Sequence, residues 1–327
     1  MHNIKRILPR AVLVAAFVVL LQELVTFLYL PYDRYSIFAN REYRAEKGKI
    51  DTLFLGTSQV YYGLDPAQFN EELGVNSFNL GTGSQSMFVA YQLLEEALDI
   101  NPVNQVILGI SFSSLMKKET DDAVLGGYDR LITLTGKLRY ILADSNSKRQ
   151  INELFYSTRV TDYLNLKLVK KNIQKKLDPD YETTKPSASD NAYSFRGYRT
   201  TSQVFNGERT SDENASYHKW NREKIIPENE TYFRKILELC REKDITVHLV
   251  LLPVSEAFLE DAGDTEDMHQ YFAEAAKNYG AEFHDFLNLE NREELFSNEY
   301  FRDIDHLNTR GAHVLGNLLI EEMKKTP

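Results

Sequence analysis

A single cysteine, Cys240, occurs among the 327 residues, and this scarcity limits the sites that the chain can build. One thiol excludes an intramolecular disulfide framework and any zinc site that needs several cysteines. Cys240 lies in the apolar-periodic run 232–243, where a buried free thiol is the expected state. Extracellular proteins do not require disulfides, so the count leaves the compartment open.

Basic residues are also scarce relative to acidic ones. The chain has 38 Lys and Arg against 48 Asp and Glu, a net charge of -10. Residues 1–30 hold three basic residues and one acid, a net of +2, so the remainder carries -12. An acidic body of this size argues against nucleic acid as a partner and against a polybasic membrane-docking surface.

One long hydrophobic run is present, AVLVAAFVVLLQELVTFLYL at residues 11–30. Twenty residues rise about 30 Å as a helix, which is the thickness of a bilayer core. Basic residues precede the run, so the positive-inside rule predicts a cytoplasmic N-terminus and an exported body. The sequence therefore predicts a cytoplasmic tail and transmembrane anchor over 1–30, with the globular domain outside the cytoplasm.

A cleaved signal peptide is the alternative for this segment. Its apolar core would be shorter and would end in a small-x-small site, whereas this run ends in Phe27-Leu28-Tyr29-Leu30-Pro31. Within the run, Glu23 is costly in lipid unless it is protonated, paired or near the interface. It either reaches toward the headgroups or pairs with a membrane partner.

Short apolar strands alternate with helical patterns after a tether over 31–48. Strands are expected at 50–55, 75–80, 106–110, 246–252 and 281–286, and helices at 66–73, 86–98, 228–243, 266–279 and 308–325. This alternation predicts an α/β, doubly wound parallel sheet within a domain at 49–327. The interval 119–225 interrupts it and is expected to form an inserted, mostly helical subdomain.

A serine follows the first expected strand, in Leu55-Gly56-Thr57-Ser58. Ligands of open parallel sheets bind beyond the carboxyl ends of the strands, so Ser58 is placed at the functional edge. A serine at this position is also a common helix N-cap, which remains the alternative reading.

A possible base for this serine lies near the other end of the chain, in Asp303-Ile304-Asp305-His306. A nucleophilic serine needs a base, and the base needs an acceptor that holds its tautomer. Asp303, three residues before His306, can turn its carboxylate onto Nδ1 and leave Nε2 free for Ser58. Asp305 is the alternative acceptor, although its adjacency to His306 makes the geometry poor.

These blocks resemble the SGNH (GDSL-like) hydrolase superfamily in their order and context. Gly56-Thr57-Ser58 resembles the first block, with Thr57 in place of the usual Asp, and 79–83 resembles the glycine-bearing second block. Asp303-x-x-His306 with Leu307, Asn308 and Gly311 resembles the last block. The resemblance covers 50–115 and 226–325. It implies a flavodoxin-like three-layer fold and a hydrolase or esterase with Ser58, His306 and Asp303 as its triad, without cofactor or metal.

The third block departs from the family. Where relatives carry Gly-x-Asn-Asp, this chain has Gly109-Ile110-Ser111-Phe112-Ser113, so the asparagine that would help to bind the oxyanion is absent. The resemblance leaves the backbone N–H groups of Ser58 and Gly83 as donors, with a hydroxyl from Ser111 or Ser113 as the third. Losing one such donor typically costs about 10²–10³ in rate, so fast ester hydrolysis is not expected.

The chain is similar to the anchored SGNH proteins that accompany membrane-bound O-acyltransferases in the cell envelope. That similarity implies an acyltransferase or esterase acting on acyl esters of a cell-surface polysaccharide, with a membrane-bound O-acyltransferase as partner. The alternative is a non-catalytic SGNH-scaffold module that binds the polysaccharide or the membrane partner. The missing asparagine favours the module, whereas the intact Ser, His and Asp favour an enzyme.

Two further groups of residues have both an ordinary and a functional reading. His248 and His284 fall within apolar strands and are expected to be satisfied core residues. Aromatic residues with two arginines gather between 193 and 220, where they form either subdomain core or a sugar-stacking platform. They are Tyr193, Phe195, Arg196, Tyr198, Arg199, Phe205 and Trp220.

Overall fold

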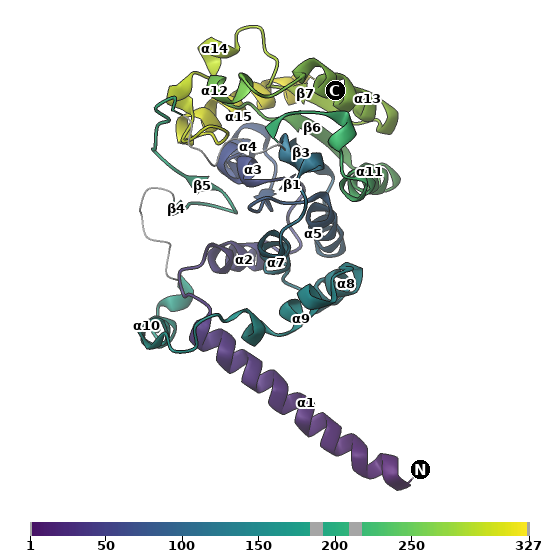
Figure 1. Ribbon diagram of the computed structural model, residues 1–327, viewed down its shortest axis with the longest axis vertical. Coiled ribbons are helices and arrows are strands. Elements are labelled where there is room, and N and C mark those ends of the chain that lie inside the picture. Colours follow the sequence, from purple (N-terminus) through teal and green to yellow (C-terminus); the bar gives the residue numbers. More distant parts are fainter. Residues whose placement is uncertain (1, 184–191, 209–217, 326–327) are drawn as a thin grey trace. The chain divides into compact units, whose positions relative to one another are not determined.

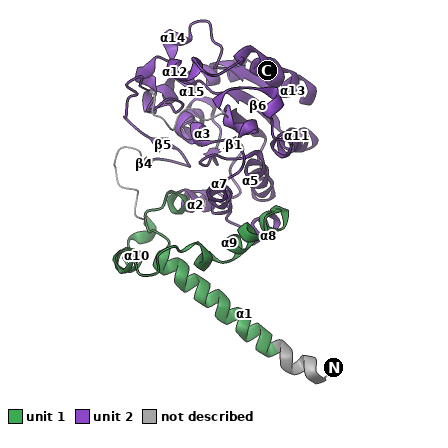
Figure 2. Ribbon diagram, viewed as in Figure 1, with its two compact units in different colours: residues 1–38, 140–185 green, residues 39–139, 186–327 purple. Residues whose placement is uncertain are grey.

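The computed structural model describes residues 2–183, 192–208 and 218–325 (Figure 1). The chain divides into two compact units (Figure 2). The first consists of 1–38 and 140–185, and the second of 39–139 and 186–327. The interval 119–225 contributes residues to both units.

A five-stranded sheet forms the centre of the second unit, with every neighbouring pair of strands parallel. The strands are β1 (Thr52–Leu55), β2 (Ser77–Asn79), β3 (Gln105–Ile110), β6 (Thr246–Leu251) and β7 (Glu282–Asp285). Their order, β2-β1-β3-β6-β7, is the flavodoxin-like one. The predicted α/β fold class is therefore confirmed.

Long helices cover both faces of this sheet. Neighbouring residues of β7 show the two sides, because successive side chains of a strand point to opposite faces. The Phe283 ring contacts His269 of α13 (Thr265–Tyr279), whereas His284 bonds Glu322 of α15 (Thr309–Lys325). α15 packs with α4 (Pro66–Leu73), and α13 packs with α11 (Pro227–Glu242), which in turn packs with α5 (Met87–Ile100).

Shorter elements complete the second unit. They are α3 (Ser58–Gly63), α6 (Ser113–Met116), α7 (Asp121–Tyr128), β4 (Ala192–Tyr193), β5 (Arg199–Thr200), η5 (Arg222–Lys224), α12 (Glu256–Leu259), α14 (Arg292–Leu295) and η6 (Asn298–Tyr300). α8 (Leu134–Ala143) and α2 (Tyr35–Ala45) each cross the boundary between the units. The segment 31–48, expected as a tether, thus contains helix α2, and its residues Ala39 and Tyr43 are buried.

Four of the aromatic residues between 193 and 220 are buried in the core, and only Phe195 of the named rings is partly exposed. Tyr193, Tyr198, Phe205 and Trp220 are each at most 8% exposed. The Trp220 indole N–H donates to Asp267, which satisfies its polar end inside the fold. A sugar-stacking surface made of these rings is therefore excluded.

The first unit is built around helix α1 (His2–Tyr29). Its segment Pro9–Tyr29 has a mean hydropathy of 2.4 and is long and apolar enough to cross a membrane, by length and composition. The rest of the unit includes α9 (Ser147–Leu154), η1 (Tyr156–Arg159), α10 (Leu166–Lys176) and η2 (Tyr181–Thr183). α10 and η1 pack directly on α1.

Polar side chains of this unit satisfy the end of α1. The Asn172 amide donates to the Leu28 carbonyl at 2.7 Å and accepts from Tyr32 N–H at 3.0 Å. Lys176 Nζ donates to the carbonyls of Phe27 at 2.7 Å and Leu30 at 2.5 Å. The carbonyls of a last helical turn have no partner within the helix, and here side chains from α10 supply partners for several of them.

Candidate active site

Ser58 is the first residue of α3, immediately beyond the carboxyl end of β1. Thr57 is the N-cap of this helix, and its hydroxyl accepts from Gln59 N–H. The N-cap alternative for Ser58 is therefore wrong, and its hydroxyl is available for other partners. Gly56 allows the tight turn, because its φ is +141° and an added Cβ would lie 2.6 Å from the Gly109 carbonyl oxygen.

The loop that carries His306 closes on itself before α15. Phe301 and Leu307 form an antiparallel bridge, and Asn308 anchors both ends. The Asn308 amide donates to the carbonyls of Glu299 and Phe301, while its oxygen accepts from Gly311 N–H. The residues that follow His306 in the last motif therefore fix the geometry of the loop.

The three residues predicted as a triad lie within hydrogen-bond reach of one another. Ser58 Oγ is 2.6 Å from His306 Nε2, and His306 Nδ1 is 2.8 Å from Asp303 Oδ1. Asp303 Oδ1 also accepts from the backbone N–H of His306 at 2.9 Å, which holds carboxylate and ring in one arrangement. Their roles in a reaction stay a prediction.

A second carboxylate, Asp305, also lies beside the ring. Its Oδ1 is 2.9 Å from His306 Nδ1, although only the Asp303 contact has hydrogen-bond geometry. Burial by itself lowers the pKa of His306, but the charge of the adjacent Asp305 and the hydrogen bond to Asp303 outweigh it and raise that pKa to about 10. Sequence reasoning underestimated Asp305, because it could not foresee that the loop turns this side chain back onto the ring.

Two backbone donors lie at the ends of β1 and β2. No hydrogen bond is formed by the N–H of Ser58 or of Gly83 with any other described residue, so both are available to an oxyanion. The two loops are joined, because Thr82 N–H donates to the Gly56 carbonyl at 3.2 Å. Buried Gln85 joins them again: its oxygen accepts from Gly56 N–H and its amide donates to the Leu80 carbonyl.

Ser111, the expected third donor, is engaged elsewhere. Its hydroxyl is 2.9 Å from that of Ser113 and 3.1 Å from that of Ser114, at the start of α6. These hydroxyls bond one another, and none of their described contacts reaches Ser58 or His306. The assignment of a third oxyanion donor to Ser111 or Ser113 therefore remains a prediction.

Sequence reasoning also missed two residues that support the site. Gln59 donates its amide to the Asp305 carbonyl at 2.7 Å, which ties α3 to the histidine loop. Tyr62 places its ring edge-on to His306, at 5.5 Å between centroids, and the Arg302 guanidinium lies over the same ring. A glutamine directly after a nucleophile motif carries no signal of its own, so only the fold reveals this contact.

Two groups of described residues have the composition and spacing of metal ligands. One is Asp303, Asp305 and His306, which belongs to the site just described; the other is His248, Glu282 and His284 on the sheet.

Comparisons with known proteins assign no family to this chain. No family model matches it, and no curated protein matches it. A solved structure from Bacteroides fragilis NCTC 9343, described as a "putative acylhydrolase", is 12% identical, with a TM-score of 0.38 over 88% of this chain and 94% of that chain. The chemistry of the site therefore rests on the geometry of its own side chains.

Proposed function

We propose that this chain is an SGNH-type serine esterase or O-acyltransferase. The observation that supports this most strongly is the continuous contact from Ser58 Oγ to His306 Nε2, at 2.6 Å, and from His306 Nδ1 to Asp303, at 2.8 Å. A nucleophile, a base and a residue that orients the base are the minimum for acyl transfer through a serine ester. They stand at the sheet edge where ligands of such folds bind.

The proposed reaction has two halves. In the first, His306 Nε2 takes the Ser58 proton while Oγ bonds to the acyl carbon, and the N–H groups of Ser58 and Gly83 hold the oxyanion. The bond to the leaving oxygen then breaks, and His306 returns the proton to it. In the second half, an acceptor hydroxyl gives its proton to His306 and attacks the carbonyl of the serine ester. The bond from the acyl carbon to Oγ breaks, and His306 returns the proton to Oγ, which restores Ser58.

The acceptor in this proposal is a hydroxyl of a cell-surface polysaccharide, with water as a slow substitute. The hydroxyl network of Ser111, Ser113 and Ser114 stands where relatives carry an asparagine amide, so stabilisation of the oxyanion is expected to be weaker. A bound acceptor and a donor delivered by a membrane-bound O-acyltransferase can recover rate through proximity, worth up to about 7–11 kcal/mol. Weak hydrolysis of acetyl esters and efficient transfer are therefore expected together.

Covalent trapping tests the nucleophile. An organophosphonate ester should label the wild-type chain at Ser58, and Ser58→Ala should abolish the labelling, as read by peptide mass spectrometry. Ser147→Ala is the matched control, because Ser147 is likewise the first residue of a helix but is exposed in the other unit. In cells, deletion of the gene should lower ester content on the surface polymer, and a Ser58→Ala copy should fail to restore it.

The labelling and the complementation experiments together separate the two candidate functions. The missing asparagine favours a non-catalytic binding module. A module of that kind would show no labelling of Ser58, and a Ser58→Ala copy would restore the polymer ester fully. A rise in polymer ester on deletion would identify a de-esterase instead of a transferase.

We further propose that α1 is a retained anchor with the second unit outside the cytoplasm. Cleavage near Leu30 would leave the half-buried Lys176 without its carbonyl partners Phe27 and Leu30. Gln22, which interrupts the apolar run next to Glu23, exchanges two hydrogen bonds with Ser157, at 2.7 and 3.0 Å. These contacts support a helix that belongs to the mature protein.

The side of the first unit near the end of α1 also suits a lipid interface. Ser157 of η1 contacts α1 at Gln22, so the part of α1 that η1 leaves uncovered runs from Pro9 to Leu21. That part is about 20 Å long, which is shorter than the hydrocarbon core of a bilayer. Leucines elsewhere in this unit are strongly exposed, and in this proposal they contact lipid. They include Leu142, Leu154, Leu164, Leu166 and Leu177.

The anchor assignment predicts the fate of the N-terminus. The purified chain should keep residues 1–30 and an intact mass of 37.8 kDa, and it should stay with the membrane after carbonate extraction. A reporter fused after Pro327 should be active only outside the cytoplasm. A soluble product that begins near residue 31 would instead identify α1 as a cleaved signal sequence.

A further inference from the structure

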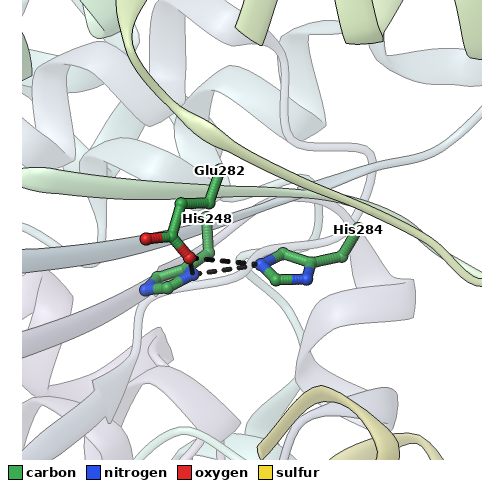
Figure 3. Close-up of side chains that lie close together, drawn as sticks. All are labelled: His248, Glu282 and His284. Atoms are coloured by element: carbon green, nitrogen blue, oxygen red, sulfur yellow. Dashed lines mark hydrogen bonds and ion pairs between the residues drawn. The ribbon is translucent and has the colours of Figure 1, made fainter. Parts of the chain in front are cut away.

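A second cluster of titratable side chains lies on the sheet strands farthest from β1 and β2. His248 of β6 stands opposite Glu282 of β7 in the parallel register, and His284 follows Glu282 by two residues. Side chains two residues apart on a strand share a face, so all three point to the same side. Figure 3 shows the two imidazoles and the carboxylate converging on one point.

The distances among the converging atoms are those of ligands around one ion. His248 Nδ1 is 3.1 Å from His284 Nε2 and 3.3 Å from Glu282 Oε2, and His284 Nε2 is 4.0 Å from the same oxygen. A tetrahedral zinc ion, with bonds of roughly 2.0–2.1 Å, places its ligand atoms about 3.3 Å apart. An ion of that size therefore fits with small side-chain adjustments.

The surroundings of this cluster call for a positive charge. His248 and His284 are 3% and 5% exposed. Glu282 Oε2 is buried and has no hydrogen-bond donor among the described residues. A buried carboxylate oxygen without a donor is costly, and coordination to a cation would remove that cost.

A further carboxylate orients one of the imidazoles. Glu322 of α15 lies 2.6 Å from His284 Nδ1, so that nitrogen carries the proton and the lone pair of Nε2 faces the cluster. Metal-bound histidines commonly donate their other N–H to a carboxylate in this way.

We propose that a divalent transition-metal ion of the zinc class binds to His248 Nδ1, His284 Nε2 and Glu282 Oε2, with Glu322 as the outer partner of His284. The donor set of two imidazoles and one carboxylate suits zinc, and water completes a tetrahedron. The ion joins β6 to the edge strand β7, and through Glu322 to α15. Its role is structural and independent of the serine chemistry, because Ser58 follows β1, two strands away from β6.

Metal titration of the full-length chain in detergent tests this site. Chelator-stripped protein should take up one equivalent of Zn²⁺ by equilibrium dialysis, and its Tm should rise by several degrees at Zn²⁺ well above the dissociation constant. Co²⁺ in place of Zn²⁺ should give the intense visible absorption of a tetrahedral site. His284→Gln and Glu282→Gln should each abolish uptake, and Glu322→Gln should weaken it by about 10–100-fold.

Two control variants locate the ion. His269→Gln removes a histidine that pairs with Asp285 at 2.6 Å on the other face of the sheet, and it should leave uptake unchanged. His306→Gln removes the histidine of the other carboxylate cluster and should also leave uptake unchanged. The proposal is overturned if the wild-type chain binds no Zn²⁺, or if uptake survives His284→Gln and is lost in His306→Gln. Circular dichroism of each ligand variant reports its folding independently, so loss of uptake in a folded variant is distinguished from a folding defect.

Discussion

Asp303→Asn and Asp305→Asn are expected to change the reactivity of Ser58 in opposite directions at pH 7. Asp303 makes the hydrogen bond to His306 Nδ1 at 2.8 Å, so its loss frees the ring to adopt the wrong tautomer. In an established triad the same substitution costs about 10⁴ in rate. We therefore expect the rate of organophosphonate labelling to fall by about 10³–10⁴ in Asp303→Asn.

Asp305 acts through its charge rather than through a hydrogen bond with good geometry. In the proposed reaction the neutral ring is the base, and with a pKa of about 10 only a small fraction of His306 is neutral at pH 7. Labelling by the wild-type chain should therefore rise roughly tenfold per pH unit below that pKa. Removing the Asp305 charge destabilises the imidazolium and lowers the pKa, so Asp305→Asn should move the pH profile to lower pH and raise the rate at pH 7.

The pH profiles of the two variants provide the measurement. The plateau rate at high pH should be nearly unchanged in Asp305→Asn and strongly reduced in Asp303→Asn. If the plateau falls in Asp305→Asn and survives in Asp303→Asn, Asp305 is the residue that orients His306. If both variants keep the wild-type profile, neither carboxylate acts on the ring.

The sheet could be predicted from the sequence because its signals are local. Each expected strand is a short apolar run, and the structure places β1, β3 and β6 within two residues of the expected ends. Their burial on both faces follows from the parallel arrangement. Helix boundaries were similarly readable where a cap marks them, as at Gly74, whose left-handed conformation ends α4.

Contacts between distant segments could not be predicted in the same way. The polar helix α2 lies where a tether was expected, because the burial of Ala39 and Tyr43 depends on partners far along the chain. The pairing of α1 with α10 depends on two side chains, Asn172 and Lys176, that look like ordinary surface residues in sequence.

The candidate site likewise contains residues that local sequence motifs reveal and residues that only the folded structure reveals. Ser58, Asp303 and His306 were readable because each sits in a motif with characteristic spacing. Gln85 could not be identified from the sequence, because no local pattern indicates that a side chain after β2 bonds to the turn after β1. The alternation of Glu282 and His284 on a strand was visible, but their convergence with His248 required the strand register.

Gly311→Ala is expected to damage both stability and reactivity. A Cβ at this position would lie 2.1 Å from the Tyr300 carbonyl oxygen and 2.8 Å from a Leu307 methyl carbon. The Tyr300 carbonyl is backbone and already accepts from Asn308 N–H at 2.9 Å, so it cannot yield without moving the loop. Overpacking of this kind typically costs about 1–3 kcal/mol, so the Tm should fall by several degrees.

That displacement should reach His306, the proposed base. The loop from Tyr300 to Asn308 carries His306, and an antiparallel bridge between Phe301 and Leu307 makes it move as one piece. A misplacement of about 1 Å in a reacting group can cost about 10² in rate, so labelling of Ser58 should fall by that factor in the folded variant. Gly126→Ala is the matched control, because an added Cβ there meets no atom within 4 Å in helix α7, and alanine favours the helix. Labelling and thermal unfolding of both variants provide the measurement. A Gly311→Ala chain with wild-type labelling would mean that the loop does not position His306.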